Sequence, residues 1–448
     1  MDFFIQRSEL RDIYDKVAAG ERVSDTDALR LFESKDLNAV GAIADFARQK
    51  KTGNNRASYI INRYINYSNY CILSCQFCSF AKKKRDADGF QFTVEEIVEK
   101  AREVLKLGIT ELHIVGGLHP SLPFSYYTDM LKALRALDGG RGRREEAQTE
   151  IRNPKSEIRN SQSLVTSAPA QKLHLKCFTA IEILHLAWLA KKSTEETLRE
   201  LKAAGLDSLT GGGAEIFRKE VRSAIAKGKE SAEEYLEVHR IWHKLGGRST
   251  CTMLYGHVES LADRVDHLRQ LRALQDEARS NGFGGPASAG PEPPEGGTPN
   301  SYGGFVGFVP LPYQPVDNDI PVAKPPTGFD SLRTIAVSRI YLDNFDHITA
   351  YWVGLGLKLA QVALSYGADD LHGTIIEEHI FHMAGATSPQ LQTEADMLKA
   401  IREAGRTPVQ RNTFYEPIRI LEPLQAATPE AAENAALSKM LEDNLATA

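Results

Sequence analysis

Cysteine is scarce in this chain, and so are long apolar runs and any large excess of charge of one sign. Only 5 of the 448 residues are cysteines, which argues against a disulfide framework and favours a reducing compartment. A formal net charge of −5 argues against a nucleic-acid surface. No apolar run reaches membrane-spanning length, and the start of the sequence has no basic region followed by an apolar core. We therefore expect a cytoplasmic protein that binds neither nucleic acid nor a membrane.

Three of the cysteines are concentrated in one short stretch. Cys71, Cys75 and Cys78 form a C-x3-C-x2-C array. Three thiolates are one ligand short of a closed tetrahedral site, so a metal or cluster held by them keeps one position open for a substrate or cofactor. The array therefore favours an iron–sulfur cluster with one open iron.

Two alternatives for the cysteine array remain at this point. The spacing i, i+4, i+7 also suits a buried stripe on one helical face. The three residues could also be most of a structural zinc site with a distant fourth ligand, although no second C-x2-C pair follows.

The rest of the chain alternates between strand and helix patterns. Strands are expected at residues 59–67, 111–115, 173–178, 207–210, 249–255, 305–311, 348–353 and 370–376, with helical periodicity between most of them. The fold class predicted from this alternation is α/β, a (β/α)8 TIM-barrel-like fold. We expect an N-terminal helical layer over 1–56, the barrel over 57–385, a C-terminal helical extension over 386–425 and a flexible tail over 426–448.

Two segments interrupt the alternation. Residues 139–171 contain a tandem heptad, EIRNPKS followed by EIRNSQS, and residues 278–302 are rich in Gly, Pro and Ser. Both are predicted to be disordered surface insertions at helix-to-strand connections, away from the catalytic end of the barrel.

Polar residues and glycines recur where the expected strands end. The active site of such a barrel lies at the carboxyl ends of its strands. The residues placed there by the sequence are Gly116, Gly117, His119, Thr179, Glu182, Gly211, Gly212, Gly213, Glu215, Tyr255, His257, Tyr351, His372 and Thr374. Paired glycines allow the backbone to approach a ligand closely, although a single Gly-Gly is also an ordinary turn.

The cysteine array, with Phe77 before its last member and Gly116-Gly117 after the next strand, resembles the radical S-adenosylmethionine (SAM) superfamily. Within it, several passages resemble the aminofutalosine synthase family of the futalosine route to menaquinone. They are HLKCFTAIEI (174–183), SLTGGGAE (208–215), TMLYGH (252–257), AYWVGLGLKLAQ (350–361) and GADDLHGT (367–374). The resemblance covers roughly residues 40 to 416, and the two insertions depart from the family pattern but lie outside every matched passage.

This resemblance implies a radical SAM fold and a specific reaction. Cys71, Cys75 and Cys78 would hold a [4Fe-4S] cluster whose open iron binds SAM, and a one-electron donor such as flavodoxin or ferredoxin would reduce it. The 5′-deoxyadenosyl group would add to the vinyl carbon of 3-[(1-carboxyvinyl)oxy]benzoate, and rearrangement with loss of a carboxylate would give 6-amino-6-deoxyfutalosine and methionine. The alternatives are a dehypoxanthine futalosine cyclase, a deazaflavin-cofactor synthase and, from a different class, a zinc-stabilised barrel without catalysis.

The resemblance also implies roles for individual residues. Gly116, Gly117 and His119 are expected to lie near the methionine part of SAM, Glu182 near its ribose or ammonium, and Gly211, Gly212, Gly213 and Glu215 near the adenosine or substrate. His119, Arg63 and His257 are the candidates for binding the two substrate carboxylates, and Arg63, Glu182 and His257 are the catalytic candidates. Arg339, Cys177 and Cys251 are expected to be structural.

Overall fold

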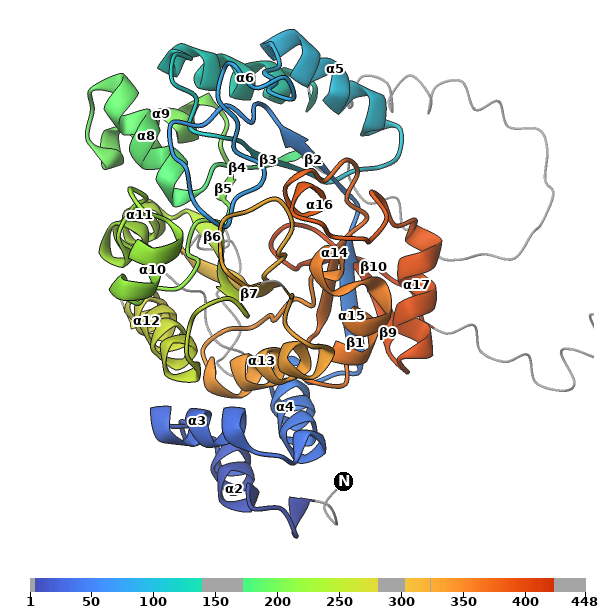
Figure 1. The fold of residues 1–448 in the computed structure, drawn as a ribbon. Helices are drawn as coiled ribbons and strands as arrows, with labels where there is room; N and C mark the ends of the chain where they lie inside the picture. The colour runs from blue at the N-terminus through green and yellow to red at the C-terminus, as the bar shows by residue number, and fades with distance from the viewer. Residues whose placement is uncertain (1–4, 139–171, 281–302, 323, 423–448) are drawn as a thin grey trace, which may run out of the picture.

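Parallel strands surrounded by helices form the centre of the protein (Figure 1). The computed structural model describes residues 5–138, 172–280, 303–322 and 324–422. One 6-stranded parallel sheet follows chain order. Its strands are β2 (Asn62–Asn66), β3 (Glu111–Val115), β4 (His174–Cys177), β5 (Ser208–Leu209), β6 (Arg248–Tyr255) and β7 (Gly304–Pro312). The predicted α/β fold class is confirmed.

Shorter pairings close the ring between β7 and β2. Phe308 of β7 forms a parallel bridge with Ile348, and Thr349 forms one with Asp370, the first residue of β8 (Asp370–Gly373). β8 pairs with β1 (Arg56–Ile60), which continues through Ile61 into β2. The seventh strand predicted at 348–353 is therefore reduced to two bridges, because the chain turns at Tyr351 into the short helix α14 (Trp352–Leu355).

Helices cover the outer face of the strands (Figure 1). They are α5 (Val94–Leu105), α6 (Phe124–Ala136), α8 (Ala180–Ala190), α9 (Thr194–Ala204), α10 (Lys219–Ile225), α11 (Ala232–Lys244), α12 (Leu261–Ser280), α13 (Gly328–Tyr341) and α15 (Leu357–Ala363). The short helix α16 (Ile380–Met383) instead contributes Ile380 and Phe381 to the cavity described below. α8, α10 and α16 were not predicted, and α12 extends three residues into the second predicted insertion, which was placed from residue 278. The remainder of that insertion, the first insertion and the predicted tail lie outside the described residues. Among the described helices, none is long and apolar enough to cross a membrane.

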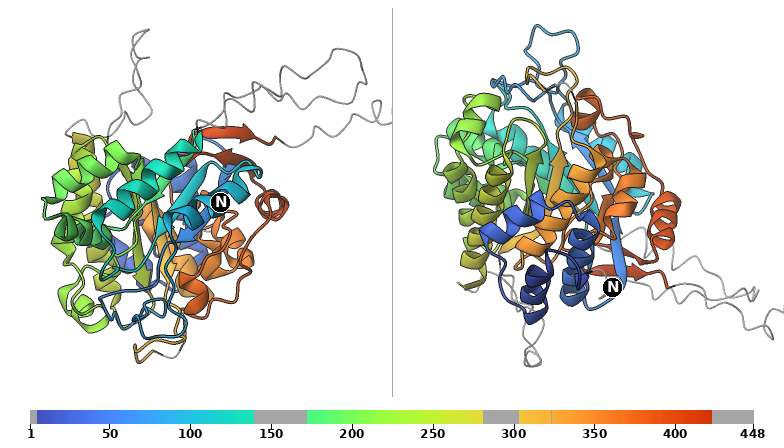
Figure 2. Two further views of the ribbon diagram at one scale, coloured as in Figure 1. Left: turned by 90° about the horizontal axis from the view of Figure 1, so that it is seen from above. Right: turned by 60° about the horizontal axis from the view of Figure 1, so that its bottom comes forward.

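The N-terminal helical layer is present as predicted. It consists of α2 (Arg11–Ala19), α3 (Asp25–Glu33) and α4 (Leu37–Thr52). α4 and α3 pack against α13, and α3 also packs against α12. Figures 1 and 2 show these blue helices together at one edge of the molecule, outside the ring of barrel helices. They cover the outer face of the barrel and contribute no residue to the cavity described below.

The C-terminal region differs from the helical extension predicted for 386–425. It begins with α17 (Glu394–Glu403) but continues as a hairpin of β9 (Thr407–Arg411) and β10 (Pro417–Ile420). β9 pairs in parallel with Arg56–Tyr59 of β1. This edge of β1 is open because β3 pairs with β2 and does not extend as far as β1. The hairpin thus satisfies backbone groups that the ring leaves open at its amino-terminal end.

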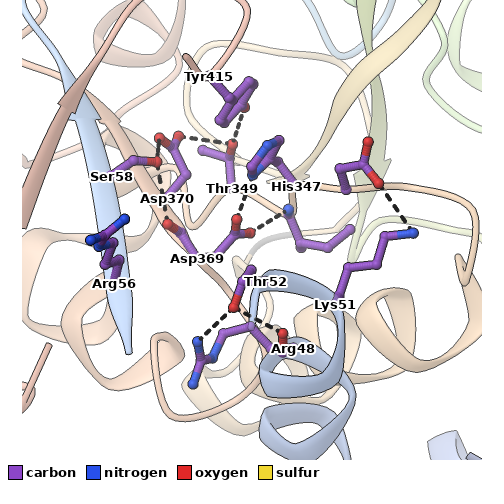
Figure 3. A network of polar contacts seen from close by, with 12 residues as sticks. Arg48, Lys51, Thr52, Arg56, Ser58, His347, Thr349, Asp369, Asp370 and Tyr415 are labelled. Atoms are coloured by element: carbon purple, nitrogen blue, oxygen red, sulfur yellow. Dashed lines mark hydrogen bonds and ion pairs between the residues drawn. The ribbon is translucent and has the colours of Figure 1, made fainter. Parts of the chain in front are cut away.

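A buried ion pair fixes this hairpin to the barrel. The Arg411 guanidinium donates from Nε and Nη2 to the two carboxylate oxygens of Asp370, at 2.6 and 2.9 Å. Ser58 and Thr349 donate their hydroxyl protons to the same carboxylate, and the Tyr415 ring stacks on His347 above it (Figure 3). Both members of the pair have buried side chains.

Replacing Arg411 with methionine is expected to lower the free energy of unfolding by about 3–5 kcal/mol, because the Asp370 charge is then buried without its cation. The midpoint of urea unfolding measures this loss. Arg419 on the neighbouring strand is the matched control: it pairs with Glu394 while 47% of its side chain is exposed. Arg419→Met is expected to cost about 0–1 kcal/mol. Equal losses in the two variants would contradict the importance assigned to the buried pair.

Candidate active site

A cavity of about 280 Å³ opens at the carboxyl ends of the strands. The three cysteines of the array line it together with the glycine-rich strand ends, and polar side chains of the strand interiors line its floor. The predicted site residues that line it are Cys71, Cys75, Cys78, Gly116, Gly117, Thr179, Glu182, Gly211, Gly212, Gly213, Glu215, Tyr351 and His372. The expectation that the active site lies at the carboxyl ends of the strands therefore located most of the predicted site residues in one cavity.

The cysteine loop is held by its own backbone and by one lysine. The Lys83 ammonium donates to the carbonyls of Cys71 and Leu73, at 2.8 and 2.7 Å. The Ile72 amide donates to the Leu118 carbonyl just after the Gly-Gly turn, at 2.9 Å. All three cysteines are half-buried and free of disulfides. The loop therefore directs three thiols into the same cavity.

The three thiols suit an iron–sulfur cluster better than a single ion. Among the described residues, no group of three or more Cys, His, Asp or Glu is gathered closely enough to hold one metal ion. In a cubane cluster each thiolate binds a different iron, so its sulfurs lie farther apart than around one zinc. Burial raises the pKa of the Cys75 thiol to about 12, against the opposing charge of Lys229, so the bound metal must supply the charge that keeps the thiolate ionised.

The sequence also contains one H-x3-H pair, His239 and His243, of the kind that completes many zinc sites. Both rings lie within hydrogen-bonding distance of the Ser249 hydroxyl, at 2.9 Å each, and are fully buried. Burial lowers the pKa of His239 to about 3. The pair lies on the buried face of α11, and neither ring lines the cavity.

Gly116 and Gly117 allow the cysteine loop to pack against the end of β3. A Cβ at Gly117 would lie 2.4 Å from the Tyr70 carbonyl oxygen, and a Cβ at Gly116 would lie 2.6 Å from the Tyr67 ring. The Gly117 amide donates to the Ser68 carbonyl at 2.8 Å. The two glycines were expected to allow close approach of a ligand. In the structure, the groups that approach them closely are Tyr67 and Tyr70, in the segment that leads into the cysteine loop.

Glu182 connects three parts of the site. Its Oε1 accepts from the Tyr67 hydroxyl (2.8 Å) and the Gly116 amide (3.1 Å), while Oε2 accepts from the Thr179 amide and hydroxyl, both at 2.7 Å. A carboxylate has about four acceptor positions, so all of them are in use. Glu182 lines the cavity but holds the end of β2, the Gly-Gly turn and the start of α8 in place.

The Gly211–Gly213 turn packs against β6 and a buried ion pair. A Cβ at Gly211 would lie 2.6 Å from Cys251 Cα. Glu215 pairs with Lys229, whose ammonium also lies over the Phe77 ring of the cysteine loop, 5.3 Å from its centroid. Sequence patterns gave no signal for Lys229, which lies in the short connection between α10 and α11.

The three residues predicted to bind the substrate carboxylates do not line the cavity. Arg63 precedes the inward-facing Tyr64 on β2, so its side chain lies on the outer face of the strand. There it pairs with Glu377 at 2.5 Å. The His119 ring accepts from the Ser121 and Leu122 amides, and the buried His257 ring donates to the Leu254 carbonyl and accepts from the Val258 amide. The two histidines stabilise their own turns and Arg63 forms an ion pair outside the cavity, so the placement of all three in a carboxylate site is corrected.

Two lysines line the cavity: Lys229, which pairs with Glu215, and Lys176 of β4. Tyr64, His113 and His372 accompany it from neighbouring strands. Lys176 lies in an otherwise apolar strand pattern, HLKCF, and an isolated lysine at an inward position of such a strand is the signal that was overlooked. The other structural expectations are confirmed: Cys177 and Cys251 are fully buried in the core, and Arg339 forms a buried pair with Asp369.

Comparisons with known proteins agree with this arrangement. Residues 65–271 match the family model of the radical SAM superfamily, and residues 302–424 match the CofH/MqnC C-terminal region. Methylornithine synthase has a similar fold, with a TM-score of 0.61 at 15% identity over 89% of this chain and 97% of that one. Radical SAM enzymes use a [4Fe-4S] cluster and SAM, and these are the cofactors of this chain.

Three curated relatives extend over nearly the whole chain but carry different names. The aminodeoxyfutalosine synthase of Thermus thermophilus is 36% identical over 94% of this chain and 99% of its own length. The cyclic dehypoxanthine futalosine synthase of Streptomyces coelicolor is 35% identical over 92% of this chain and 89% of its own length. The 5-amino-6-(D-ribitylamino)uracil–L-tyrosine 4-hydroxyphenyl transferase of Methanopyrus kandleri is 35% identical over 92% of this chain and 100% of its own length. The chain therefore belongs to the radical SAM superfamily, in the group whose members carry the CofH/MqnC C-terminal region.

Proposed function

We propose that the protein is an aminodeoxyfutalosine synthase of menaquinone biosynthesis. It transfers the 5′-deoxyadenosyl group of SAM to the vinyl carbon of 3-[(1-carboxyvinyl)oxy]benzoate. Rearrangement and loss of one carboxylate, as bicarbonate or CO2, give 6-amino-6-deoxyfutalosine, and methionine is released. The observation that supports this assignment best is the end-to-end match with the Thermus enzyme, which covers 99% of that protein's length.

The chain's residues divide into two tasks in this reaction. Cys71, Cys75 and Cys78 hold the [4Fe-4S] cluster, which when reduced supplies the electron that breaks the carbon–sulfur bond of SAM. The strands and the cysteine loop enclose the reacting groups, with Leu254 and Leu311 among the apolar residues that line the wall. A carbon radical must be kept from water and from reactive side chains, and a largely enclosed barrel interior provides this. A small one-electron donor of the flavodoxin or ferredoxin kind reduces the cluster.

Two related activities compete with this assignment, because relatives named for them are almost as similar. They differ in the second substrate: dehypoxanthine futalosine in one, and tyrosine with a ribitylaminouracil in the other. Assay of the anaerobically reconstituted and reduced enzyme with SAM and each candidate distinguishes them. The expected result is a product with the mass of aminodeoxyfutalosine from the enolpyruvyl benzoate alone. Product formation only from either competing substrate would overturn the assignment.

A zinc-stabilised barrel without catalytic activity is distinguished by metal analysis. About four irons and four sulfides per chain are expected for a cubane cluster. A colourless protein that contains one zinc and resists reconstitution would contradict both the cluster and the reaction.

A further inference from the structure

Three polar side chains lie side by side on the floor of the cavity. In the parallel register, Tyr64 of β2 is opposite His113 of β3, and His113 is opposite Lys176 of β4. Residues in direct register on neighbouring strands point to the same face of a sheet. All three line the cavity, and they therefore form one inward-facing layer.

The Lys176 ammonium is buried and unpaired. The residue is 6% exposed. Within the described part of the chain, no hydrogen bond or ion pair reaches its Nζ. The nearest carboxylate layer is one step down the strands, where Glu111 accepts from the Asn62 amide at 3.0 Å. A buried cation without a direct partner is costly, so this position gains stability when an anion binds beside it.

Two histidines flank the lysine with unused ring nitrogens. His372 of β8 is 5% exposed, and its Nε2 lies 3.4 Å from the Tyr64 hydroxyl. The Nδ1 atoms of His113 and His372 have no hydrogen-bond partner among the described residues. Burial lowers the pKa of His113 to about 3, and it also lowers that of His372, so both rings are neutral near pH 7. Each neutral ring has one N–H to donate.

The carboxylates that line the cavity are already engaged, and the two carboxylates whose charge acts on Lys176, those of Glu111 and Asp370, make no direct contact with its ammonium. Glu182 accepts from four donors, and Glu215 pairs with Lys229. Glu378 accepts from the Ile380 and Phe381 amides and contacts the His382 ring at 3.1 Å. Among the described residues, the floor therefore offers one cation without a direct partner and two N–H donors, the groups that recognise a carboxylate.

We propose that Lys176, assisted by His113 and His372, binds the ring carboxylate of the substrate and so sets its orientation, an inference that rests on the proposed function. The other substrate carboxylate is attached to the vinyl group, which must lie near SAM at the cysteine end. Lys176 lies inside β4, whereas Thr179, the N-cap of α8, lines the cavity beyond the end of that strand. The aromatic ring then spans the cavity between the floor and the mouth.

The first arm of the test uses the wild-type enzyme alone. The substrate is compared with (1-carboxyvinyl)oxybenzene, which lacks only the ring carboxylate, and KM and kcat are measured for each. Loss of one charge-assisted contact is expected to raise KM about 10- to 100-fold. Equal KM values for the two compounds would overturn the inference without any variant.

The second arm uses Lys176→Met, with Lys100→Met as the control. Lys100 pairs with Glu377 outside the cavity, so its loss should leave both KM values unchanged. Lys176→Met is expected to raise KM for the substrate about 10- to 100-fold. Its KM values for substrate and analogue should then be equal. Iron content after reconstitution should stay at the wild-type value and show that the cluster site is intact.

The outcomes separate this inference from the proposed function. If the wild type forms no aminodeoxyfutalosine, the proposed function fails. If the wild type forms it and Lys176→Met keeps a wild-type KM or still distinguishes the analogue, the assignment of Lys176 fails and the proposed function stands.

Discussion

Replacing Cys75 with alanine is expected to abolish SAM cleavage, with methionine and 5′-deoxyadenosine falling to the background of the assay. Cys75 is the central member of the array and lines the same cavity as Cys71 and Cys78. With two thiolates, one more iron is left without a protein ligand, and a cubane bound in this way is easily lost. Iron content after anaerobic reconstitution and the rate of methionine formation measure the effect.

Cys251→Ala is the matched control for this experiment. Cys251 is fully buried in β6, with its sulfur 3.9 Å from the Gly307 carbonyl, and it lines no part of the cavity. Its loss should cost about 1 kcal/mol of stability and leave iron content and SAM cleavage unchanged. Methionine formation retained by Cys75→Ala would refute its assignment as a ligand.

The order of strands and helices followed from the sequence because strand and helix patterns alternate along the chain, and several helices, among them α5, α9 and α11, begin at a capping box. α9 has both local signals of a helix, a capping box of Ser193 and Glu196 at its start and Gly205 at its end. α8 was missed because its sequence, AIEILHLAWLA, is apolar on almost every side and has no amphipathic period. Thr179 and Glu182 form a capping box in front of it, and that local signal was available.

The location of the site was predictable from the sequence, whereas the direction of individual side chains was not. Any residue at the end of a barrel strand is near the mouth, which is why the cysteines and glycines were found together. Whether His119 or His257 faces the cavity depends on hydrogen bonds within its own turn. Arg63 and Lys176 differ only in strand parity: neighbouring Tyr64 points inward, Arg63 points outward, and Lys176 shares the register of Tyr64. Which residues of a strand point inward is fixed only when the strand pairs in register with its neighbours in the barrel.

The C-terminal hairpin shows the same dependence on long-range pairing. β9 is stable as a strand because the first half of β1 offers it an edge, and the two segments are far apart in the sequence. Once β9 is paired, Arg411 forms its ion pair with Asp370 of β8. Neither contact can be predicted from the strand propensity of the local sequence.

Glu182→Ala is expected to reduce SAM cleavage about 100-fold while the protein still folds. Removal of the carboxylate leaves the Tyr67 hydroxyl, the Gly116 amide and the Thr179 amide without their buried acceptor. Each such group costs about 1–3 kcal/mol, and the Gly-Gly turn loses the contact that sets its position against the cysteine loop. A displacement of about 1 Å at a reacting centre is enough for a 100-fold loss. The KM for SAM should rise, and the electron paramagnetic resonance signal of the reduced cluster should no longer shift when SAM is added.

The control separates this linking role from simple helix capping. Glu196 occupies the same capping-box position in α9, where its carboxylate accepts from the Ser193 amide and hydroxyl at 2.9 and 2.7 Å, but it is exposed and touches no part of the site. Glu196→Ala therefore removes a capping box alone, at a cost of about 1 kcal/mol, and should leave SAM cleavage unchanged. If Glu182→Ala impaired SAM cleavage no more than Glu196→Ala, Glu182 would be a helix cap and nothing more. A large loss in Glu182→Ala alone would instead assign the Gly-Gly turn, and the carboxylate that holds it, to the binding of SAM.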